Sequence, residues 1–597
     1  MLQPVPEDVM EPPEYFNFAA DVVDRWSESD PGLLAMQWIS DQSTTPLKLT
    51  YEHFSVQSNK AAALLRKLGA KPGDRVMMVL NRVPAWWEIA TGVLRAGLVL
   101  CPCTTLATAK DIEYRLISSA ANIFVGNQAS IASLAKIRKN CPALQVVLQA
   151  DGEQLPGVIR YQSAVDGIAT GSPTAHKTKK SDPALIYFTS GTSGPPKMVQ
   201  HNHISYPLAH LLTGTYWLGL SPGKLSWTLA EQGWAKAAWS WFATWNTGAT
   251  LFIQDTKKPF SPSETLDVLN TYPITNFCAP PTAYRQLVTK QMHQHCASNT
   301  PKALERCVAA GEPLDEGTLE AWRAMTGLQI REGYGQTETI LVAGSCEGVQ
   351  IRPGSMGKAL PGVPLHVIDD VGRPVTAGVE GEIAVLSVDE RGQRTPFVCD
   401  GYMSKEGSLS HKSRTRLSSD GSVNGQWHLT GDRAYQDADG YLWYVGRSDD
   451  VINSSGYRIG ELPPPRHTTV SARRSHLGNI KSNRSPAFSL SGPFEVESAL
   501  KLHPAVLEAA VIGVKDHSRG EVVKAFIVAE QSVLEQQTPE KLKKELQEHC
   551  KKEAAPYKYP RLVEFVKPEW LPKTISGKIQ RAEIRRRERE SARTSHL

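Results

Sequence analysis

The sequence YFTSGTSGPPK, at residues 187–197, joins an apolar run to a loop of hydroxyls and glycines that ends at a lysine. Gly191 and Gly194 let the backbone come close to an anion, because glycine has no Cβ. Successive backbone N–H groups can then surround phosphate oxygens, together with the hydroxyls of Thr189, Ser190, Thr192 and Ser193. The pattern predicts a strand and a triphosphate-binding loop, with Lys197 at its end. It is not the G-x-x-x-x-G-K-[ST] motif of P-loop NTPases, and a flexible linker is the structural alternative.

The residues on either side of this loop alternate helical patterns with short apolar runs. Residues 51–70 have the apolar spacing of an amphipathic helix, and 73–80 have the composition of a buried strand after a turn. Similar cycles begin at 185–190 and 274–281. This alternation predicts βαβ units, so the expected fold class is α/β with mixed, mostly parallel sheets.

Two further units are expected towards the C-terminus. The strand-rich stretch at 360–400 predicts a small antiparallel barrel within the large N-terminal domain. After 450 the pattern predicts a compact α+β domain of about 100 residues. Its elements are a helix, two strands and a helix at 494–504, 505–514, 524–530 and 538–553. Several domains are expected in any case, because 597 residues exceed one core of roughly 250–300 residues.

The composition is that of a folded, water-soluble chain, with 41% hydrophobic and 21% charged residues. The nine cysteines are scattered and odd in number, which favours neither a zinc site nor a disulfide framework and indicates a reducing compartment. No apolar run approaches the ~18 residues of a membrane span. The acidic, proline-containing start lacks the pattern of a signal or transit peptide.

The C-terminal end has two features of its own. Residues 585–589 are rich in arginine but are interspersed with glutamates, so a solvated helix is favoured over a nucleic-acid-binding arm. The final residues, Ser595, His596 and Leu597, have the small, basic, leucine pattern of a peroxisomal address. This tripeptide predicts a peroxisomal location, with a plain cytoplasmic tail as the alternative.

Four motifs together resemble the adenylate-forming (AMP-binding) superfamily, which includes acyl-CoA synthetases, luciferases and the adenylation domains of peptide synthetases. The loop at 187–197 is the first. The others follow in the order that this family shows: GYGQTET at 333–339, WHLTGDRAYQDADGYLWYVGRSDDVINSSGYRIG at 427–460 and LPKTISGKIQR at 571–581. The resemblance spans about 50 to 580 and is strongest to the medium-chain acyl-CoA synthetase branch. It implies an ATP-dependent acid:CoA ligase that forms an acyl-AMP intermediate and then a CoA thioester, with ATP, CoA and Mg²⁺ as cofactors.

The resemblance implies a nucleotide site built from the first two motifs and the segment AGEP. Tyr334 would stack its flat apolar face on adenine. Thr337 would hydrogen-bond the α-phosphate, and Glu338 would hold Mg²⁺, which prefers carboxylate and phosphate oxygens. The remaining members of this set are Ala310, Gly311, Glu312, Pro313, Gly333, Gly335 and Gln336.

Three later residues complete the site that the resemblance implies. Asp432 would accept both ribose hydroxyls, since a carboxylate has two acceptor oxygens, and Arg447 would support the same ribose. The alternative for Asp432 is a turn residue. Lys578 would bridge the substrate carboxylate and the α-phosphate and stabilise the adenylation transition state electrostatically.

Asp449 matches the hinge of this family, which divides the chain into an N-terminal AMP-binding domain at 1–448 and a C-terminal one at 449–597. In the family the small domain presents its lysine for adenylation and then rotates to form the CoA channel. Arg458 would contact phosphate. The channel would include Ser455, Gly456 and Tyr457.

The acyl pocket is the least determined part of the site. Residues 231–234 (EQGW) and 279–284 (APPTAY) resemble pocket walls of the medium-chain synthetases. Trp234 is assigned to the pocket, with core packing as its alternative, and Trp239, Trp241 and Trp245 are assigned to the core. The other pocket residues are Ala279, Pro280 and Tyr284. An apolar wall favours a medium-chain or aryl acid over acetate.

Residues 461–491 interrupt the third motif, which in the family continues directly from Gly460 to PFEVE at 493–497. The segment is rich in proline, serine and arginine and has no sustained period, so it is predicted to be a disordered insert. We hypothesise that it is a translated, unspliced intron, because its ends are compatible with GT and AG borders; a mature transcript that mostly retains it would contradict this. The insert follows Arg458, so it is expected to hinder thioester formation more than adenylation.

Two alternative functions remain open from the sequence. One is an adenylating enzyme that loads a carrier protein or forms an amide, although SSGYRIG and PFEVESAL match the CoA-using branch more closely. The other is a catalytically impaired homologue with a binding or regulatory role, which the insert favours. The expected partner is a small carboxylic acid, with neither nucleic acid nor a membrane span.

Overall fold

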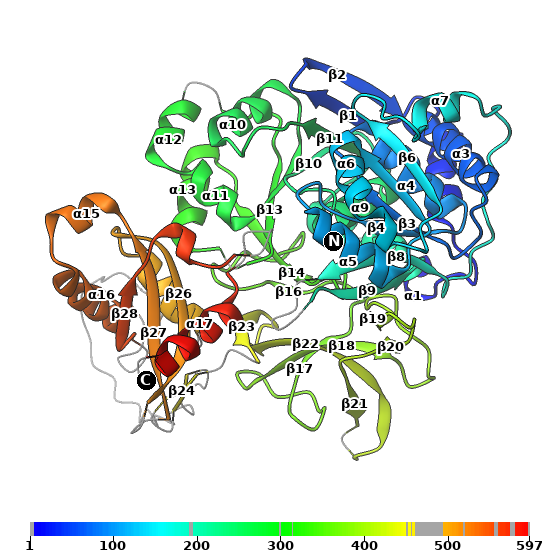
Figure 1. Ribbon diagram of the computed structural model, residues 1–597. Helices are drawn as coiled ribbons and strands as arrows, with labels where there is room; N and C mark the ends of the chain where they lie inside the picture. The colour runs from blue at the N-terminus through cyan, green and yellow to red at the C-terminus, as the bar shows by residue number, and fades with distance from the viewer. Residues whose placement is uncertain are drawn as a thin grey trace. The chain divides into compact units, whose positions relative to one another are not determined.

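The protein is described here by a computed structural model (Figure 1). Its described residues are 5–189, 195–297, 300–312, 314–418, 420–448, 452–454, 457–459, 493–516, 520–553, 559–573 and 579–594.

The chain separates into two compact units. The larger unit contains Met1–Pro374, Ala384–Thr430 and Asp439–Leu442. The smaller unit contains Val375–Ile383, Gly431–Ala438 and Trp443–Leu597. The predicted boundary residue, Asp449, lies outside the described residues, so the division at 448/449 stays a prediction.

The first sheet of the larger unit has nine strands and carries the second predicted motif. Its centre is parallel, because β10 to β13 are each followed by helical segments that return the chain to the same edge. The strand order is β16 (Lys358–Ala359), β15 (Leu341–Gly344), β14 (Ile330–Gly335), β13 (Arg306–Ala310), β12 (Asn276–Ala279), β10 (Leu225–Thr228), β11 (Thr250–Asp255), β1 (Leu34–Ser40) and β2 (Ser43–Thr50).

Helices α10 (Pro262–Thr271), α11 (Pro281–Leu287), α12 (Lys290–Ala297) and α13 (Glu316–Thr326) pack on one side of this sheet (Figure 1). They share a core with β10, β12 and β13 that contains Trp227, Phe277 and Trp322. Asp315 caps the start of α13, where its carboxylate accepts from Thr318 N–H, and Gly327 follows the last helical residue with a positive φ of 76°.

The second nine-stranded sheet carries the first motif. Its order is β20 (Leu409–Ser410), β19 (Gly401–Met403), β9 (Lys197–Asn202), β8 (Pro183–Thr189), β4 (Val99–Pro102), β3 (Arg75–Val79), β5 (Ile123–Asn127), β6 (Val146–Asp151) and β7 (Ile159–Arg160). Helices α5 (Ala109–Ser119) and α6 (Gln128–Ile137) bury Ile112, Leu116 and Leu134 against it. Strands β8 and β9 form an antiparallel hairpin around the predicted phosphate loop.

Helices α3 (Tyr51–Lys67), α4 (Pro84–Arg95) and α9 (Ala235–Asn246) meet through aromatic side chains. The rings of Trp86 and Trp241 lie 5.6 Å apart, and those of Phe54 and Trp245 lie 4.7 Å apart. Trp239, Trp241 and Trp245 are all buried, which agrees with their assignment to the core. Shorter helical segments are α1 (Glu7–Met10), η1 (Ala19–Asp24), α2 (Arg25–Ser29), η2 (Arg138–Asn140), α7 (Tyr161–Asp166), η3 (Ile204–Leu208), α8 (His210–Leu212) and η4 (Thr213–Leu218).

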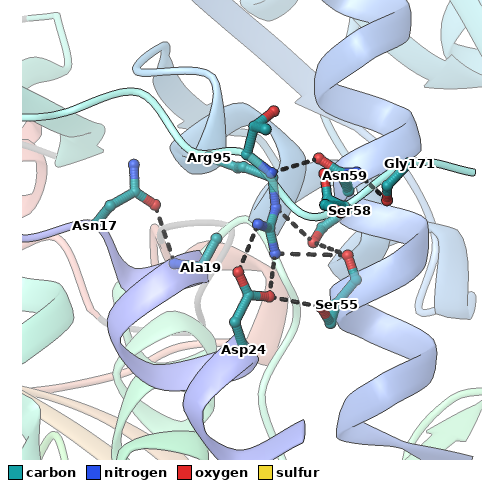
Figure 2. A network of polar contacts seen from close by, with 10 residues as sticks. Asn17, Ala19, Asp24, Ser55, Ser58, Asn59, Arg95 and Gly171 are labelled. Atoms are coloured by element: carbon teal, nitrogen blue, oxygen red, sulfur yellow. Dashed lines mark hydrogen bonds and ion pairs between the residues drawn. The ribbon is translucent and has the colours of Figure 1, made fainter. Parts of the chain in front are cut away.

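A buried ion pair joins three of these segments (Figure 2). The Arg95 guanidinium, on α4, donates to both carboxylate oxygens of Asp24, on η1, at 2.7 and 2.6 Å. Ser55 Oγ on α3 donates to the same carboxylate at 2.6 Å, and Ser58 Oγ accepts from Arg95 Nε at 3.1 Å. Every formal charge in the cluster therefore has a partner, which is the condition for burying it.

A smaller five-stranded sheet has the order β17 (Leu365–Ile368), β18 (Glu380–Val388), β22 (Val423–Gln436) and β21 (Ser413–Leu417), with β23 (Leu442–Arg447) paired to β22. It corresponds to the strand-rich stretch predicted at 360–400 and extends beyond it.

The C-terminal part is an α+β unit. Its sheet has the order β25 (Tyr457–Ile459), β24 (Ile452–Ser454), β27 (Gly520–Ala529) and β26 (Val506–Asp516), with β28 (Leu562–Phe565) beside β27. Val496 and Leu500 of α14 pack with Leu542 and Leu546 of α16 against it. The helical segments are α14 (Pro493–Lys501), α15 (Gln531–Gln536), α16 (Pro539–Glu553), η5 (Pro568–Trp570) and α17 (Arg581–Thr594).

The predicted fold class is confirmed: a large α/β part with mostly parallel sheets is followed by a small α+β part. The arginine-rich end is helical, as expected, and Glu583 pairs with Arg586 and Arg587 along α17. In the described ranges no helix combines the length and the apolar character needed to cross a bilayer. All nine cysteines are free and buried.

Candidate active site

The predicted site segments of the larger unit converge because parallel strands end at one edge of the first sheet. Cys278 pairs with Thr228, Ala279 with Ala309, and Ala310 with Gly333. The chain segments that leave β10, β12, β13 and β14 therefore begin side by side. The carboxyl edge of a parallel sheet is where α/β proteins usually bind ligands.

The segment after β13 is held by side chains from other elements. Lys236 Nζ, on α9, donates to Ala310 O at 2.5 Å. Arg285, on α11, pairs with Glu312 at 2.9 Å and with Asp315 at 3.0 Å. This fixes the main chain around Gly311, whose φ is 115°.

Glu332 lies beneath this segment on β14. Its carboxylate accepts from Leu314 N–H at 3.0 Å, and the side chain is almost fully buried. Burial raises the pKa of Glu332 to about 7, and the Leu314 hydrogen bond opposes this shift.

The GYGQTET motif spans the end of β14 and the turn to β15. A Cβ on Gly335 would lie 2.5 Å from Ile340 O, so the close approach of the two strands requires glycine there. Gln336 Nε2 donates to Thr430 O at 3.0 Å. Tyr334 and Thr337 are half-buried and remain accessible from solvent.

A buried histidine on β9 supports Thr337 from the other sheet. His201 Nε2 donates to Thr337 O at 2.7 Å, and its Nδ1 lies 3.1 Å from Ser205 Oγ. Burial lowers the pKa of His201 to about 4, so the imidazole is neutral at neutral pH. A neutral ring that donates from Nε2 accepts at Nδ1, which fits a Ser205 hydroxyl donor.

Glu338 is oriented by β19. Tyr402 Oη donates to Glu338 Oε1 at 2.8 Å, and Cys399 N–H donates to Glu338 O at 2.8 Å. Within the described ranges, no lysine or arginine lies within salt-bridge distance of this carboxylate, and no cluster of three potential metal-ligating side chains occurs. The donor set thus fits Mg²⁺ held by one carboxylate together with substrate phosphates, the usual arrangement for this ion.

The first motif is only partly described. Thr189 ends β8 and Lys197 begins β9, and the two residues are cross-strand partners. The loop between them, at 190–194, lies outside the described residues, as does Pro313.

The ribose residues predicted from the third motif belong to the smaller unit. Asp432 is almost fully buried on β22, and Arg447 Nη1 of β23 lies 3.2 Å from its carboxylate. A Cβ on Gly431 would touch the Arg447 guanidinium at 3.0 Å, and Gly431 has a φ of 74°. Asp432 and Arg447 thus form an ion pair, and its role in binding a ribose stays a prediction.

Two of the predicted acyl-pocket residues are core residues. Tyr284 is completely buried, its hydroxyl lies 3.3 Å from Val308 O, and its ring packs on Trp322. Ala279 is likewise buried on β12. Neither side chain presents a surface to a ligand, because the APPTAY segment turns directly into α11 and folds inward. Trp234 and Pro280 are half-buried at the ends of their segments.

Several predicted residues lie wholly or partly outside the described residues: Lys578, Asp449, Ser455, Gly456, the insert at 461–491, and the tripeptide Ser595, His596 and Leu597. Tyr457 and Arg458 belong to β25, but only their backbone is described.

Five side chains that hold this site were missed from the sequence: His201, Tyr402, Lys236, Arg285 and Glu332. Three of them lie close to segments recognised in the sequence: Glu332 directly precedes GYG, Arg285 directly follows APPTAY, and Lys236 lies two residues after EQGW. Their contacts are with residues distant in sequence, apart from that of Glu332, and no local pattern indicates that these side chains meet the motif residues.

Comparison with known proteins identifies the class. Residues 23–388 match the AMP-binding enzyme family, and residues 495–578 match the AMP-binding enzyme C-terminal domain. Acyl-coenzyme A synthetase ACSM3 of Mus musculus, a mitochondrial protein, is 40% identical over 591 residues, covering 97% of this chain and 92% of that protein. Human ACSM5 is 38% identical over 96% of this chain and 91% of that protein. The chain therefore belongs to the AMP-binding enzyme family, among its acyl-coenzyme A synthetases.

Solved structures agree with this assignment. The anthranilate CoA ligase AuaEII, in complex with anthranoyl-AMP, is 27% identical with a TM-score of 0.76, covering 98% of this chain and 99% of that one. The acyl-CoA synthetase of Brucella canis is 30% identical with a TM-score of 0.66, covering 97% and 96%. The protein is an AMP-forming acid–thiol ligase, which uses ATP to form an acyl-AMP and transfers the acyl group to CoA.

The predicted peroxisomal location is wrong. The relatives are mitochondrial acyl-coenzyme A synthetases. A terminal tripeptide recurs easily by chance, so it carries less weight than similarity along nearly the whole chain.

Proposed function

We propose that this synthetase activates medium-chain or aryl carboxylic acids at the carboxyl edge of the first sheet. The observation that supports this proposal is that the chain segments after β10, β12, β13 and β14 converge there. These place the half-buried Trp234 and Pro280 on the same edge as Thr337 and Glu338. An apolar wall beside phosphate-facing groups suits an acid with an apolar body. The anthranilate ligase supports an aryl substrate by analogy.

The proposed nucleotide site has the same residues as the sequence predicted. Tyr334 stacks on adenine, with Gly311, Glu312, Pro313, Gly333, Gly335 and Gln336 around it. Thr337 binds the α-phosphate and Glu338 holds Mg²⁺, which would neutralise phosphate charge. Thr189, the loop at 190–194 and Lys197 hold the outer phosphates. Asp432 and Arg447 bind the ribose.

The proposed chemistry has two steps. A substrate carboxylate oxygen attacks the α-phosphorus, the bond to the β-phosphate oxygen breaks, and pyrophosphate leaves with the electron pair. Lys578 reduces the repulsion between the two anions. The CoA thiolate then attacks the acyl carbonyl and AMP leaves, with Ser455, Gly456, Tyr457 and Arg458 at the CoA channel. Asp449 is the proposed hinge between the two steps.

We also propose that residues 461–491 slow the second step. They separate β25, which carries Tyr457 and Arg458, from α14, and they add basic residues directly after the proposed CoA contacts. Thioester formation by the full chain is compared with that of a variant lacking 461–491. A faster thioester step in the deletion variant, with equal acyl-AMP formation, is expected; equal thioester rates would contradict the proposal.

The substrate class is tested by pyrophosphate release from the purified chain with acetate, medium-chain and aryl acids, each with and without CoA. Medium-chain or aryl acids are expected to give the highest kcat/KM, and Trp234→Ala is expected to raise their KM more than that of acetate. Highest activity on acetate would refute the proposed pocket. Pyrophosphate release without thioester formation in the presence of CoA, in both the full chain and the deletion variant, would favour the impaired homologue.

A further inference from the structure

A cavity lies where β9, β19 and β20 of the second sheet end beside α5. It encloses about 430 Å³. We call it the lysine pocket, because its charged lining consists of Lys197, Lys405 and Lys412, with Tyr114 and Tyr402 as its aromatic walls. No carboxylate is among its lining residues in the described part of the chain. Such a lining is suited to a multiply charged anion.

The lysines are placed by aromatic rings rather than by acidic partners. Lys197 Nζ and Lys412 Nζ lie 5.4 and 5.7 Å from the centre of the Tyr402 ring, and Lys405 Nζ lies 5.6 Å from that of Tyr114. Across the described ranges, none of the three ammonium groups is within salt-bridge distance of a carboxylate. The carboxylate of the adjacent Glu406 is hydrogen-bonded to Ser404 and also interacts electrostatically with Lys405. The charges of Lys197 and Lys412 are therefore available to a ligand, and that of Lys405 is only partly offset.

The pocket is connected to the proposed adenylation site through two tyrosines. Tyr402 donates its hydroxyl to Glu338 at 2.8 Å while its ring forms the pocket wall. Tyr114 Oη donates to Pro196 O at 2.9 Å, just after the predicted phosphate loop. Lys197 belongs both to the loop's end and to the pocket lining. The pocket therefore adjoins the end of the loop that is proposed to hold the outer phosphates.

We propose that the lysine pocket binds inorganic pyrophosphate, the leaving group of the adenylation step. Pyrophosphate carries several negative charges and many acceptor oxygens, which match three ammonium groups and the hydroxyls of Ser404 and Ser410. Bound there, it is displaced from the α-phosphorus and so cannot easily reverse adenylation. The identification of the anion as the pyrophosphate released from ATP rests on the proposed function and orientation of ATP. The presence of an anion site rests on the lining residues alone.

The test compares the full chain with the double variant Lys405→Met and Lys412→Met, which leaves Lys197 in place. Isothermal titration calorimetry with inorganic pyrophosphate and Mg²⁺ measures binding without acid, ATP or turnover. Inhibition of acyl-CoA formation by added pyrophosphate measures the same site during catalysis. The double variant is expected to raise both the Kd and the Ki of pyrophosphate by about tenfold, since each of its two substitutions removes one charge contact of modest strength. Lys405→Arg with Lys412→Arg is expected to restore most of this affinity.

The matched control is Lys48→Met with Lys139→Met, two exposed lysines away from the pocket. These changes should leave the Kd of pyrophosphate unaltered. An equal loss in both double variants, or none in the pocket variant, would overturn the proposal. A rise in the KM of CoA without a change in the Ki of pyrophosphate would assign the pocket to CoA phosphates instead. If neither the full chain nor any variant forms acyl-AMP, the proposed adenylation site is refuted. The calorimetric result on pyrophosphate binding would still stand.

Discussion

At the scale of single residues, two buried histidines on neighbouring segments differ in their contacts. His201 joins Ser205 to Thr337 O, whereas neither ring nitrogen of His203 has a hydrogen-bond partner among the described residues. Their comparison therefore separates the effect of a hydrogen bond from that of a buried ring.

His201→Phe is expected to lower kcat for acyl-AMP formation by about tenfold, the equivalent of one net hydrogen bond. The cause is the loss of the Nε2–H bond that holds the Thr337 carbonyl. The measurement is pyrophosphate exchange into ATP, with melting temperatures recorded in parallel. His203→Phe makes the same shape change and should affect kcat much less; equal losses in both variants would show that packing, not the hydrogen bond, is responsible.

The buried Glu332 carboxyl is expected to make the free energy of unfolding depend on pH. Its pKa is about 7 when folded, against 4.5 for the ordinary group. Between these values the folded chain keeps a proton that the unfolded chain releases, so stability falls as pH rises, by at most about 1.4 kcal/mol per pH unit. Glu332→Gln should remove this part of the slope in melting experiments from about pH 4.5 to about pH 7. Glu320→Gln, at an exposed position on α13, should leave the slope as it is.

At the scale of elements, helix α11 holds the segment after β13 through Arg285. Arg285→Met removes the ion pairs to Glu312 and Asp315 and leaves the strand order untouched. The KM of ATP is expected to rise about three- to tenfold, because the segment proposed to contact adenine becomes less ordered.

The control for this change is Arg323→Met, at an exposed position on α13. It should leave the KM of ATP nearly constant. If Arg285→Met altered only the melting temperature, the arginine would be structural and not a positioning residue for the nucleotide.

At the scale of the whole molecule, stability of the larger unit depends on contacts between distant parts of the chain. Arg95 and Asp24 are separated by 71 residues and are both buried (Figure 2). Arg95→Met leaves the Asp24 carboxylate buried without its partner, which should cost about 3–5 kcal/mol of unfolding free energy.

Denaturation of this unit measures that loss. The double variant Asp24→Leu with Arg95→Met should recover much of it, since apolar replacement of both partners removes the unpaired charge. Lys224→Met, at an exposed pair with Glu305, should cost no more than about 1 kcal/mol. A loss of similar size in Lys224→Met and Arg95→Met would contradict the argument from burial.

The sequence alone determined the fold class, the family and the position of most strands near the site. These follow from local periodicity and from contiguous motifs such as GYGQTET, which the chain carries whatever its tertiary structure. It did not determine location, because a terminal tripeptide is too short to be specific. Only the tertiary structure showed that Tyr284 belongs to the core and that His201, Tyr402, Arg285 and Lys236 hold the motif segments. Such contacts depend on the pairing of remote strands and helices, and no sequence period records which side chains that pairing brings together.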